Sequence, residues 1–381
     1  MSRLSRRDVL GLLGAASLAG RAHAGAPADP ADAGFPPPPE ALPASDSLAG
    51  IAAARGLLFG SEVMASDLAD PAYAALIARE CAIITPGIEA KWPVTEPAEG
   101  RFDFTRLDTI AGFAARHGLR LHLHTLVWAV GMPPWLTRAL AEGRGEAVLR
   151  RHIATLAGRY RESAHSWDVV NEPVDPRWPS APEGLCNTPW RRFLGADYVP
   201  LAFRLAREAD PAALLMLNDD DLEYAWPDRE KKRTTYLRLI ESWLRQGVPI
   251  GGFGIEAHLK PDQPIAERDF RRFLAELAGF GLSLMVTELD IQDRTLPADI
   301  AARDRAVADA CRRYLDLVLD ERAVCGVITW GLADRFGDLD RDKTTRRADG
   351  LPSRGLPFDA ALRRKPMADA LAEAFRHAPM R

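Results

Sequence analysis

The chain has 381 residues, of which 47% are hydrophobic and 27% are charged. These proportions are ordinary for a folded globular protein, and they exclude disorder for most of the chain. The net charge of −4 argues against nucleic acid as a partner.

The first 24 residues have the features of an export signal. Arg6 and Arg7 form a twin-arginine pattern, an apolar stretch covers 9–19, and Ala22-His23-Ala24 is an A-x-A cleavage site. We therefore expect residues 1–24 to be a signal peptide and the mature protein to be periplasmic or secreted. A membrane anchor is the alternative, but the stretch is well short of the ~20 residues needed to span a bilayer. Cleavage would remove four arginines and one aspartate, which moves the net charge from −4 to −7 and leaves no stably inserted segment.

Residues 25–47 are rich in Ala and Pro and carry no apolar periodicity, which predicts a linker. From residue 48 to residue 381, short apolar runs alternate with longer amphipathic stretches. The expected strands are 57–60, 82–85, 119–124, 166–170, 214–218, 252–257, 282–287 and 324–330. The expected helices include 105–117, 146–161, 199–208, 229–246, 265–280 and 298–320. Eight β-then-α units predict a single α/β domain over 48–381, a (β/α)8 TIM barrel. An open doubly wound sheet shares the alternation, but no strand is followed by a glycine-rich phosphate-binding motif.

Four cysteines, Cys81, Cys186, Cys311 and Cys325, would meet an oxidising compartment after export. We expect Cys311 and Cys325 to be the pair that forms a disulfide. Free buried thiols are the alternative, because sequence does not set connectivity.

Polar and aromatic residues gather at the carboxyl ends of the expected strands, which form the functional face of a TIM barrel. They are Glu89, Lys91, Trp92, His124, Trp128, Asn171, Glu172, Asn218, Asp219, Glu256, His258, Glu288, Asp290 and Trp330. We expect these side chains to converge on one mouth.

Two of them, Glu172 and Glu288, are glutamates that end apolar runs. An ionised side chain is costly away from water unless it is partnered or used in chemistry. Glycosidic cleavage by retention needs a carboxylic acid to protonate the leaving oxygen and a carboxylate nucleophile about 5 to 5.5 Å away. We interpret Glu172 as the acid/base and Glu288 as the nucleophile. Structural ion pairs at the rim are the alternative for both.

Asp290 lies two residues after Glu288, and so on the same face of the strand if the strand persists. His258 between these carboxylates could hold Glu288 ionised and oriented. Indole rings near strand ends could form a platform for sugar rings, and the chain has three in such positions: Trp92, Trp128 and Trp330.

A rival interpretation comes from His122 and His124, which project to one face of the third strand and could bind a metal. Such a centre needs further His or Lys ligands, and of the eight histidines only His258 lies at another strand end. We therefore expect no metal and no other cofactor. His124 is better interpreted as a partner of a sugar hydroxyl.

The chain resembles the glycoside hydrolase family 10 endo-β-1,4-xylanases over nearly all of residues 48–375. The similarity rests on ordered motifs: K-W-x-x-x-E-P at 91–97, H-T-L-V-W at 124–128, W-D-V-V-N-E at 167–172 and T-E-L-D at 287–290. The resemblance implies a retaining enzyme that acts on β-1,4-xylan or xylo-oligosaccharides, with Glu172 as acid/base and Glu288 as nucleophile.

The same resemblance implies roles for the surrounding residues. Asn171 would contact the sugar 2-hydroxyl, and His258 with Asp290 would orient Glu288. The substrate-binding positions it implies are Lys91, His124 and Trp128 on the glycone side and Trp330 beneath the ring at the cleavage point.

Several positions depart from the family pattern. Gly87 and Ile88 stand where the family has a Glu and an Asn that grip the next glycone sugar, so that subsite should be weaker unless Glu89 compensates. Glu256 replaces the usual Gln, which places a third carboxylate near the catalytic pair and should raise at least one pKa. Further departures are Ala129, Asp220 and Asp338.

Two other functions fit the same residues. One is an exported hydrolase of short or decorated β-linked oligosaccharides, with an altered glycone subsite. The other is a weakly active carbohydrate-binding relative, which the presence of both glutamates disfavours. We expect the mature chain to be a monomer.

Overall fold

The computed structural model describes residues 43–174 and 181–381. The predicted signal peptide, 1–24, and all but the last five residues of the predicted linker, 25–47, lie outside the described residues. The first helix begins at Leu48, and the Ser47 side chain caps it by accepting a hydrogen bond from the Gly50 amide.

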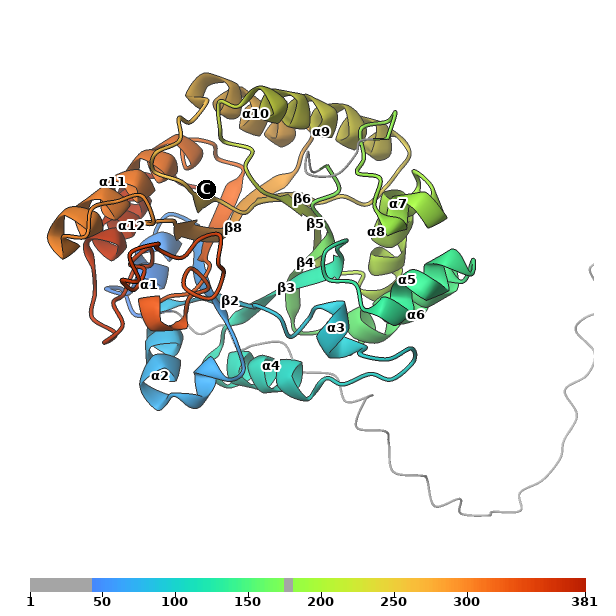
Figure 1. Cartoon of the computed structure of the whole chain (residues 1–381), viewed down its shortest axis with the longest axis horizontal. Helices are drawn as coiled ribbons and strands as arrows, with labels where there is room; N and C mark the ends of the chain where they lie inside the picture. Colours follow the sequence, from blue (N-terminus) through green and yellow to red (C-terminus); the bar gives the residue numbers. More distant parts are fainter. Residues whose placement is uncertain (1–42, 175–180) are drawn as a thin grey trace, which may run out of the picture. The chain divides into compact units, whose positions relative to one another are not determined.

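The fold is a closed parallel barrel with helices between its strands, which confirms the predicted (β/α)8 TIM barrel (Figure 1). Neighbouring strands pair in chain order, and the ring closes because β6 pairs with β8 and β9 pairs with β1. The short strand β7 adds only to β8, at the mouth. The strands are β1 (Leu58–Val63), β2 (Ile83–Pro86), β3 (Arg120–Val127), β4 (Ala164–Asn171), β5 (Leu214–Asp219), β6 (Gly252–Ile255), β7 (His258–Leu259), β8 (Ser283–Ile291) and β9 (Val324–Thr329).

Helices surround the barrel in Figure 1. The six predicted from periodicity are present as α4 (Thr105–His117), α6 (Gly145–Tyr160), α8 (Tyr198–Ala209), α9 (Pro227–Arg245), α10 (Glu267–Gly279) and α11 (Ile300–Val318). The others are α1 (Leu48–Ala53), α2 (Pro71–Glu80), α3 (Trp92–Thr95), α5 (Pro134–Ala141), α7 (Pro189–Leu194) and α12 (Pro366–His377), with 3₁₀ turns η2 (Asp67–Ala69) and η3 (Asp334–Phe336). In the described part of the chain, no helix is both long enough and apolar enough to cross a bilayer.

Two strands differ from their predicted bounds in ways that shape the site. Strand β6 stops at Ile255, because Ala257 has a φ of 63°, a left-handed value that an extended strand does not adopt. Strand β8 instead continues to Ile291, so Glu288 and Asp290 both lie within it. The short β7 then places His258 opposite Asp290.

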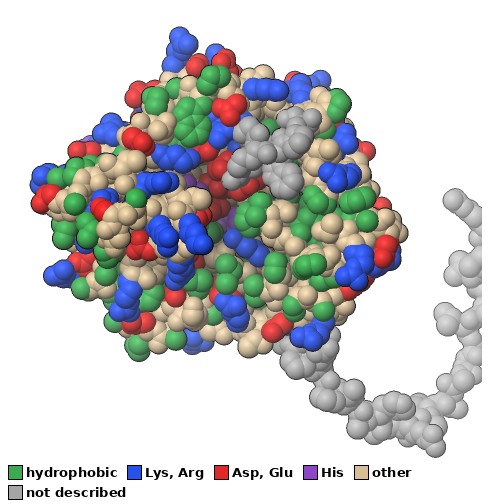
Figure 2. Space-filling model, viewed as in Figure 1, with side chains coloured by type: hydrophobic (Ala, Val, Ile, Leu, Met, Phe, Trp, Pro, Cys, Tyr) green, Lys and Arg blue, Asp and Glu red, His purple; other side chains and the backbone are tan. Residues whose placement is uncertain are grey.

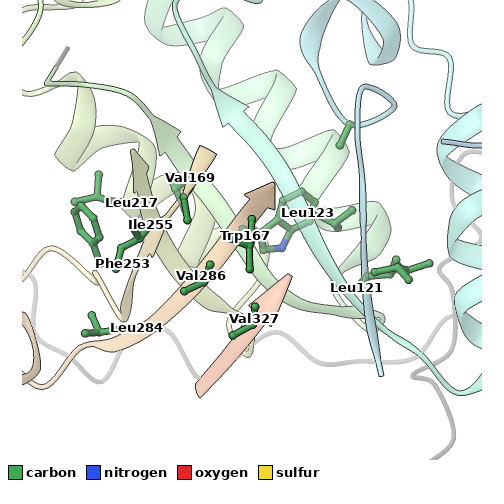
Figure 3. Packing of buried hydrophobic residues seen from close by; sticks show 14 of the residues in the cluster. Leu121, Leu123, Trp167, Val169, Leu217, Phe253, Ile255, Leu284, Val286 and Val327 are labelled. Atoms are coloured by element: carbon green, nitrogen blue, oxygen red, sulfur yellow. The ribbon is translucent and has the colours of Figure 1, made fainter. Parts of the chain in front are cut away.

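The core has an outer and an inner part, as expected from the two-residue alternation of strands. Strand residues such as Leu123, Trp167, Leu217 and Val286 belong to the large cluster that packs with the helices (Figure 3). The alternate positions form a small separate cluster of Ile83, Met216, Met285 and Ile328.

Polar side chains occupy other positions of the same inward face. His122 and Asp168 are both buried and lie 3.0 Å apart, and Thr287 donates a hydrogen bond of 2.7 Å to Asn218. The strands therefore deliver apolar residues to one part of the barrel interior and a hydrogen-bonded polar layer to another.

The predicted Cys311–Cys325 disulfide is wrong in this structure, where all four cysteines are free. Cys311 lies on α11 in the large core cluster. Cys325 lies on β9 against the small inner cluster, and its Sγ donates to the Leu284 carbonyl at 3.2 Å. The two thiols therefore belong to different packing layers.

Candidate active site

A cleft of about 990 Å³ opens at the carboxyl ends of the strands. Figure 2 shows acidic side chains gathered in a hollow at the centre of this face, with Lys and Arg side chains near its edge. Ten of the fourteen residues predicted at the mouth line this cleft, and they include every residue to which a catalytic or substrate-binding role was assigned: Lys91, His124, Trp128, Asn171, Glu172, Glu256, His258, Glu288, Asp290 and Trp330. The strand order brings together residues up to 239 positions apart in the sequence.

Glu172 is the residue that follows β4. Its φ is 50°, so the backbone turns away from the strand at this position, and its amide donates to the Asn218 carbonyl at 3.0 Å. The neighbouring β5 therefore fixes the turn that presents the carboxyl to the cleft.

Glu288 lies within β8 and is almost fully buried, with 5% of its surface exposed. One oxygen, Oε1, accepts a hydrogen bond of 2.9 Å from Asn218 and lies 3.6 Å from His124 Nδ1. The other oxygen, Oε2, lies 3.3 Å from His258 Nε2. Burial by itself would raise the pKa of Glu288, but His124, His258 and Lys91 outweigh it and lower that pKa below its usual range. The group is therefore held as a carboxylate.

His258 connects this carboxylate to Asp290. Its Nδ1 lies 3.1 Å from Asp290 Oδ1, while Nε2 faces Glu288. Burial disfavours the charged imidazole, yet Asp290 and Glu288 more than compensate and raise the pKa of His258 well above its usual value. The pKa of Asp290 is also raised, chiefly because the group is buried. A cationic His258 thus lies between the carboxyl groups of Glu288 and Asp290.

Asn218 was predicted to lie at the mouth, but no role in catalysis or substrate binding was assigned to it. Its Nδ2 donates to Glu288 at 2.9 Å, to Asn171 at 2.9 Å and to Glu256 at 3.3 Å. It therefore joins β4, the residue that follows β6, and β8 beneath the cleft. The signal for it in the sequence was the Asn-Asp pair at the end of the fifth strand.

Asp168 is a second residue that sequence reasoning missed. It is fully buried, and its Oδ2 lies 3.0 Å from His122 Nε2 and 2.9 Å from His124 Nδ1. Burial would raise its pKa, but the two imidazoles outweigh burial and lower the pKa of Asp168 to about 2. The other nitrogen of His122 lies 2.8 Å from Ser166 Oγ, so both nitrogens of this ring already have protein partners. The rival metal interpretation of His122 and His124 therefore has little support from their geometry.

The aromatic wall on one side of the cleft consists of Trp128 and Trp330. Lys91 Nζ lies 4.8 Å from the Trp128 ring centre and 5.7 Å from that of Trp330, within the range of a cation–π contact. His124 meets Trp330 edge-on at 5.8 Å. The Trp330 indole nitrogen donates to Asp338 at 3.1 Å.

Trp92 does not belong to this wall, contrary to the expectation of a three-indole platform. It is 1% exposed, and its ring stacks on His152 with centres 3.4 Å apart. Its indole nitrogen donates to the Leu126 carbonyl, so both its face and its polar edge are used in the core.

Glu256 brings a third carboxyl next to the proposed catalytic pair. A Glu256 oxygen lies within 4.8 Å of a His258 ring nitrogen and a Glu288 oxygen, and a Glu256 oxygen likewise lies within 4.8 Å of oxygens of Glu172 and Asp220. Burial, Glu288, Glu172 and Asp220 all raise the pKa of Glu256 well above its usual value. The carboxyl therefore holds its proton at pH values where an exposed glutamate is ionised.

Glu89 does not reach the cleft, so it does not compensate for Gly87 and Ile88. Its side chain is buried, accepts from the Ala65 amide at 3.0 Å and pairs with Arg106 at 3.2 Å. The space beside Gly87 is instead taken by Glu62 of β1, whose Oε1 would lie 2.1 Å from a Cβ at position 87. A side chain at residue 87 and the present position of Glu62 exclude each other.

The geometry can now be compared with known proteins. The family model for glycosyl hydrolase family 10 matches residues 47–374. The chain is similar to endo-1,4-beta-xylanase 1 of Humicola insolens, with 31% identity over 309 residues that cover 78% of this chain and 68% of that protein. It is also similar to endo-1,4-beta-xylanase B of Thermotoga neapolitana, with 30% identity, 69% of this chain and 73% of that protein.

The chain is also similar in fold to solved structures of xylanases. Native xylanase 10B from Thermotoga maritima superposes with a TM-score of 0.77 and 28% identity, over 86% of this chain and 98% of that one. Xylanase 10B from Thermotoga petrophila RKU-1, solved in complex with xylobiose, gives a TM-score of 0.75 and 27% identity, over 86% and 97% of the two chains. Because the family model covers most of the chain and the relatives share its fold, the chain belongs to glycosyl hydrolase family 10.

Proposed function

We propose that this protein is a retaining endo-β-1,4-xylanase, with Glu288 as its nucleophile and Glu172 as its acid/base. The observation that carries the proposal is the state of Glu288, a buried carboxylate held ionised by His258, His124 and Asn218 in a cleft that Glu172 also lines. A carboxylate that is costly to bury is kept charged where a sugar would bind.

In the first step, Glu288 attacks the anomeric carbon of the sugar on the glycone side and forms a glycosyl ester. The bond to the leaving oxygen breaks, and the Glu172 carboxyl donates its proton to that oxygen. The two hydrogen-bond and ion-pair contacts to Oε1 and Oε2 hold the attacking carboxylate in place before substrate arrives.

In the second step, the ionised Glu172 takes a proton from a water molecule, which attacks the anomeric carbon and releases Glu288. Two inversions give net retention of the β configuration. The released Glu288 is again a carboxylate and again pairs with the cationic His258, whose other ring nitrogen pairs with Asp290. The site has then returned to its starting state.

The remaining residues bind the sugar. Asn171, oriented by Asn218, contacts the 2-hydroxyl, and Lys91 and His124 contact glycone hydroxyls beside the rings of Trp128 and Trp330. Catalysis by this route uses only side chains of the chain and water.

The function is tested by a time course of products from xylan and from xylohexaose, with Glu288→Gln protein as the blank. Internal scission of both substrates, absent from the blank, supports the proposal. Hydrolysis of the hexaose alone would restrict the enzyme to short oligosaccharides. Wild-type rates at the level of the blank on both would refute action on xylan.

The two roles are separated by azide rescue with 4-nitrophenyl β-xylobioside. In Glu172→Ala protein, azide should intercept the glycosyl ester and give β-xylobiosyl azide. In Glu288→Ala protein, azide should attack the anomeric carbon directly and give the α product. The reverse pair of products would exchange the two assignments, and the anomeric proton coupling in NMR distinguishes them.

We further propose that the enzyme is exported by the twin-arginine route and acts as a monomer in the periplasm or outside the cell. The pattern at Arg6 and Arg7 supports the route. Replacing both with Lys should retain the uncleaved precursor in the cytoplasm, as N-terminal sequencing and fractionation would show. Export that persists in the variant would contradict the route, and a mass of one chain by light scattering would support the monomer.

A further inference from the structure

The centre of the cleft is acidic and its edge is basic. At the centre, Glu172, Asp220 and Glu256 each place an oxygen within 4.8 Å of the others. Figure 2 shows Lys and Arg side chains near the edge of the same hollow. A carboxylate carried by the substrate would be repelled at the centre and attracted at the edge. The charge distribution therefore suits a neutral sugar backbone at the centre and an anionic branch at the edge.

One arginine at this edge has a charge that the protein does not pair. In the described part of the chain, four Lys and Arg side chains line the cleft: Lys91, Lys260, Arg294 and Arg341. Carboxylates hold Lys260 and Arg341, and Lys91 lies beside two indole rings. Arg294 has no ion pair among the described residues, and its guanidinium donates instead to the Thr344 carbonyl. Of these four groups, Arg294 is thus the one with a charge left for a ligand.

Two segments fix the position of Arg294. It follows β8, and the Thr344 carbonyl that it contacts lies in the long segment after β9. From that second segment, the buried side chain of Arg347 donates to the Leu296 carbonyl at 3.1 Å and to the Asp293 carbonyl. The backbone on both sides of Arg294 is thereby tied to the neighbouring segment. Less freedom is then lost when the guanidinium binds a ligand.

The chemistry of this position points to a carboxylate. A guanidinium presents a planar fork of N–H donors that matches the two oxygens of a carboxylate, and Thr344 uses only the Nη1 group of Arg294. Thr295 and Thr345 line the same cleft and place hydroxyl-bearing side chains there with the guanidinium. On a backbone of neutral pentoses, a uronic acid branch is the group that offers both a carboxylate and ring hydroxyls.

We propose that Arg294 binds the carboxylate of a uronic acid branch on the xylan chain, which makes it a specificity-determining residue for uronic-acid-substituted xylan. This inference rests on the proposed function. Arg294 comes just after β8, the strand that carries Glu288, so the branch is bound near the cleaved bond. The charge of the branch then contributes to kcat/KM although it takes no part in the chemical steps.

The test compares a uronic-acid-substituted xylan with the same polymer after its carboxyl groups have been reduced to alcohols. The two substrates share their backbone and branches and differ in charge. We expect the wild-type kcat/KM to be about fivefold higher on the acidic polymer, the scale of one exposed ion pair. Arg294→Gln should bring this ratio close to one. Arg294→Lys, which keeps the charge but not the fork, should give an intermediate ratio.

Arg268→Gln is the matched control, because it removes an exposed arginine of α10 that does not line the cleft. Its ratio should equal that of the wild type. A wild-type ratio of one would overturn the inference, as would an Arg294→Gln ratio equal to the wild-type value. An equal loss on both polymers in Arg294→Gln would also overturn it, because the arginine would then support the wall without binding a charge. Wild-type protein that cleaves neither polymer would instead refute the proposed function.

A second measurement needs no variant, and so does not depend on whether Arg294→Gln folds. The ratio of kcat/KM on the two polymers is measured in about 20 mM and in about 500 mM sodium chloride. Because salt screens an exposed ion pair, the inference expects the ratio to fall towards one at the higher concentration. A preference for the acidic polymer that salt leaves unchanged would contradict it.

Discussion

Asp168 is the residue on which the two histidines of β3 depend. One oxygen of its carboxylate forms hydrogen bonds with both His122 and His124, and the pKa of Asp168 is lowered to about 2 from a usual value of 3.8. Because the folded pKa is the lower one, the ionised form stabilises the fold above about pH 4, and this contribution disappears as the pH falls towards 2. The shift corresponds to about 2 kcal/mol.

We therefore expect Asp168→Asn to lower the free energy of unfolding by about 2 kcal/mol at pH 7, because the variant loses the ionised oxygen that His122 and His124 share. Urea unfolding at a series of pH values checks this. The difference between wild type and variant should shrink as the pH falls from 4. A difference that is constant with pH would show that packing, and not ionisation, accounts for the loss.

Glu256 gives a prediction about activity. Burial and the neighbouring carboxyls of Glu288, Glu172 and Asp220 raise its pKa, and His258 on β7 opposes them. Below that pKa the group is neutral, so an amide can replace it. Above it, a further negative charge appears within 4.8 Å of carboxyl oxygens of both Glu172 and Glu288.

Glu256→Gln should accordingly keep kcat/KM within about threefold of wild type at acidic pH and retain more activity on the alkaline limb. The measurement is a pH profile of kcat/KM on an aryl xylobioside, with the solvent-exposed substitution Glu276→Gln as a control. Superimposable profiles of wild type and Glu256→Gln would refute a role for this proton.

At the scale of elements, the contact between β1 and β2 distinguishes this chain. Glu62 pairs with Thr85 in the register of these strands, and its buried side chain fills the space beside Gly87. A Cβ at residue 87 would lie 2.1 Å from Glu62 Oε1 and 3.0 Å from its Cδ. The carboxyl must move for any larger residue to be accepted.

Gly87→Ala should therefore cost about 1–3 kcal/mol, the usual range for overpacking. In a Glu62→Ala background the same substitution should cost less, because the opposing carboxyl is gone. A double-mutant cycle by chemical denaturation measures the coupling. Additive effects would mean that Glu62 relaxes without cost.

The sequence predicted the barrel and the residues of its mouth because both depend on local pattern. Each strand is a short apolar run followed by polar residues, and parallel strands place those residues together. Asn218 was recognisable as a strand-end residue, but its three side-chain contacts depend on neighbours on β4, directly after β6 and on β8 that only the closed ring brings close.

The errors have a common cause, which is that position after a strand does not decide where a side chain points. Trp92 follows β2 but begins a helical turn, and its ring packs on His152, sixty residues further along. Glu89 turns to the Ala65 amide and to Arg106. The left-handed backbone at Ala257, which ends β6 early, has no signature in an alanine.

At the scale of the whole molecule, stability rests on packing between the barrel and its helices. Cys81, Cys186 and Cys311 are buried, and burial raises the pKa of Cys81 and of Cys311, so their thiolates do not form in the folded state at neutral pH. Cys325 is partly buried, and burial raises its pKa as well. No cross-link restrains the unfolded chain in this arrangement.

We expect that Ellman's reagent labels fewer than one thiol rapidly in the native protein at pH 7.5 and all four after unfolding in guanidinium. The free energy of unfolding should be the same with and without a reductant, because a disulfide of this spacing would otherwise contribute about 3 kcal/mol through the unfolded state. Cys311→Ser protein, in which no 311–325 bond can form, is the control for the reductant series. Two reactive thiols after unfolding, together with stability lost on reduction, would show that protein exported to an oxidising compartment forms a bond that this packing lacks.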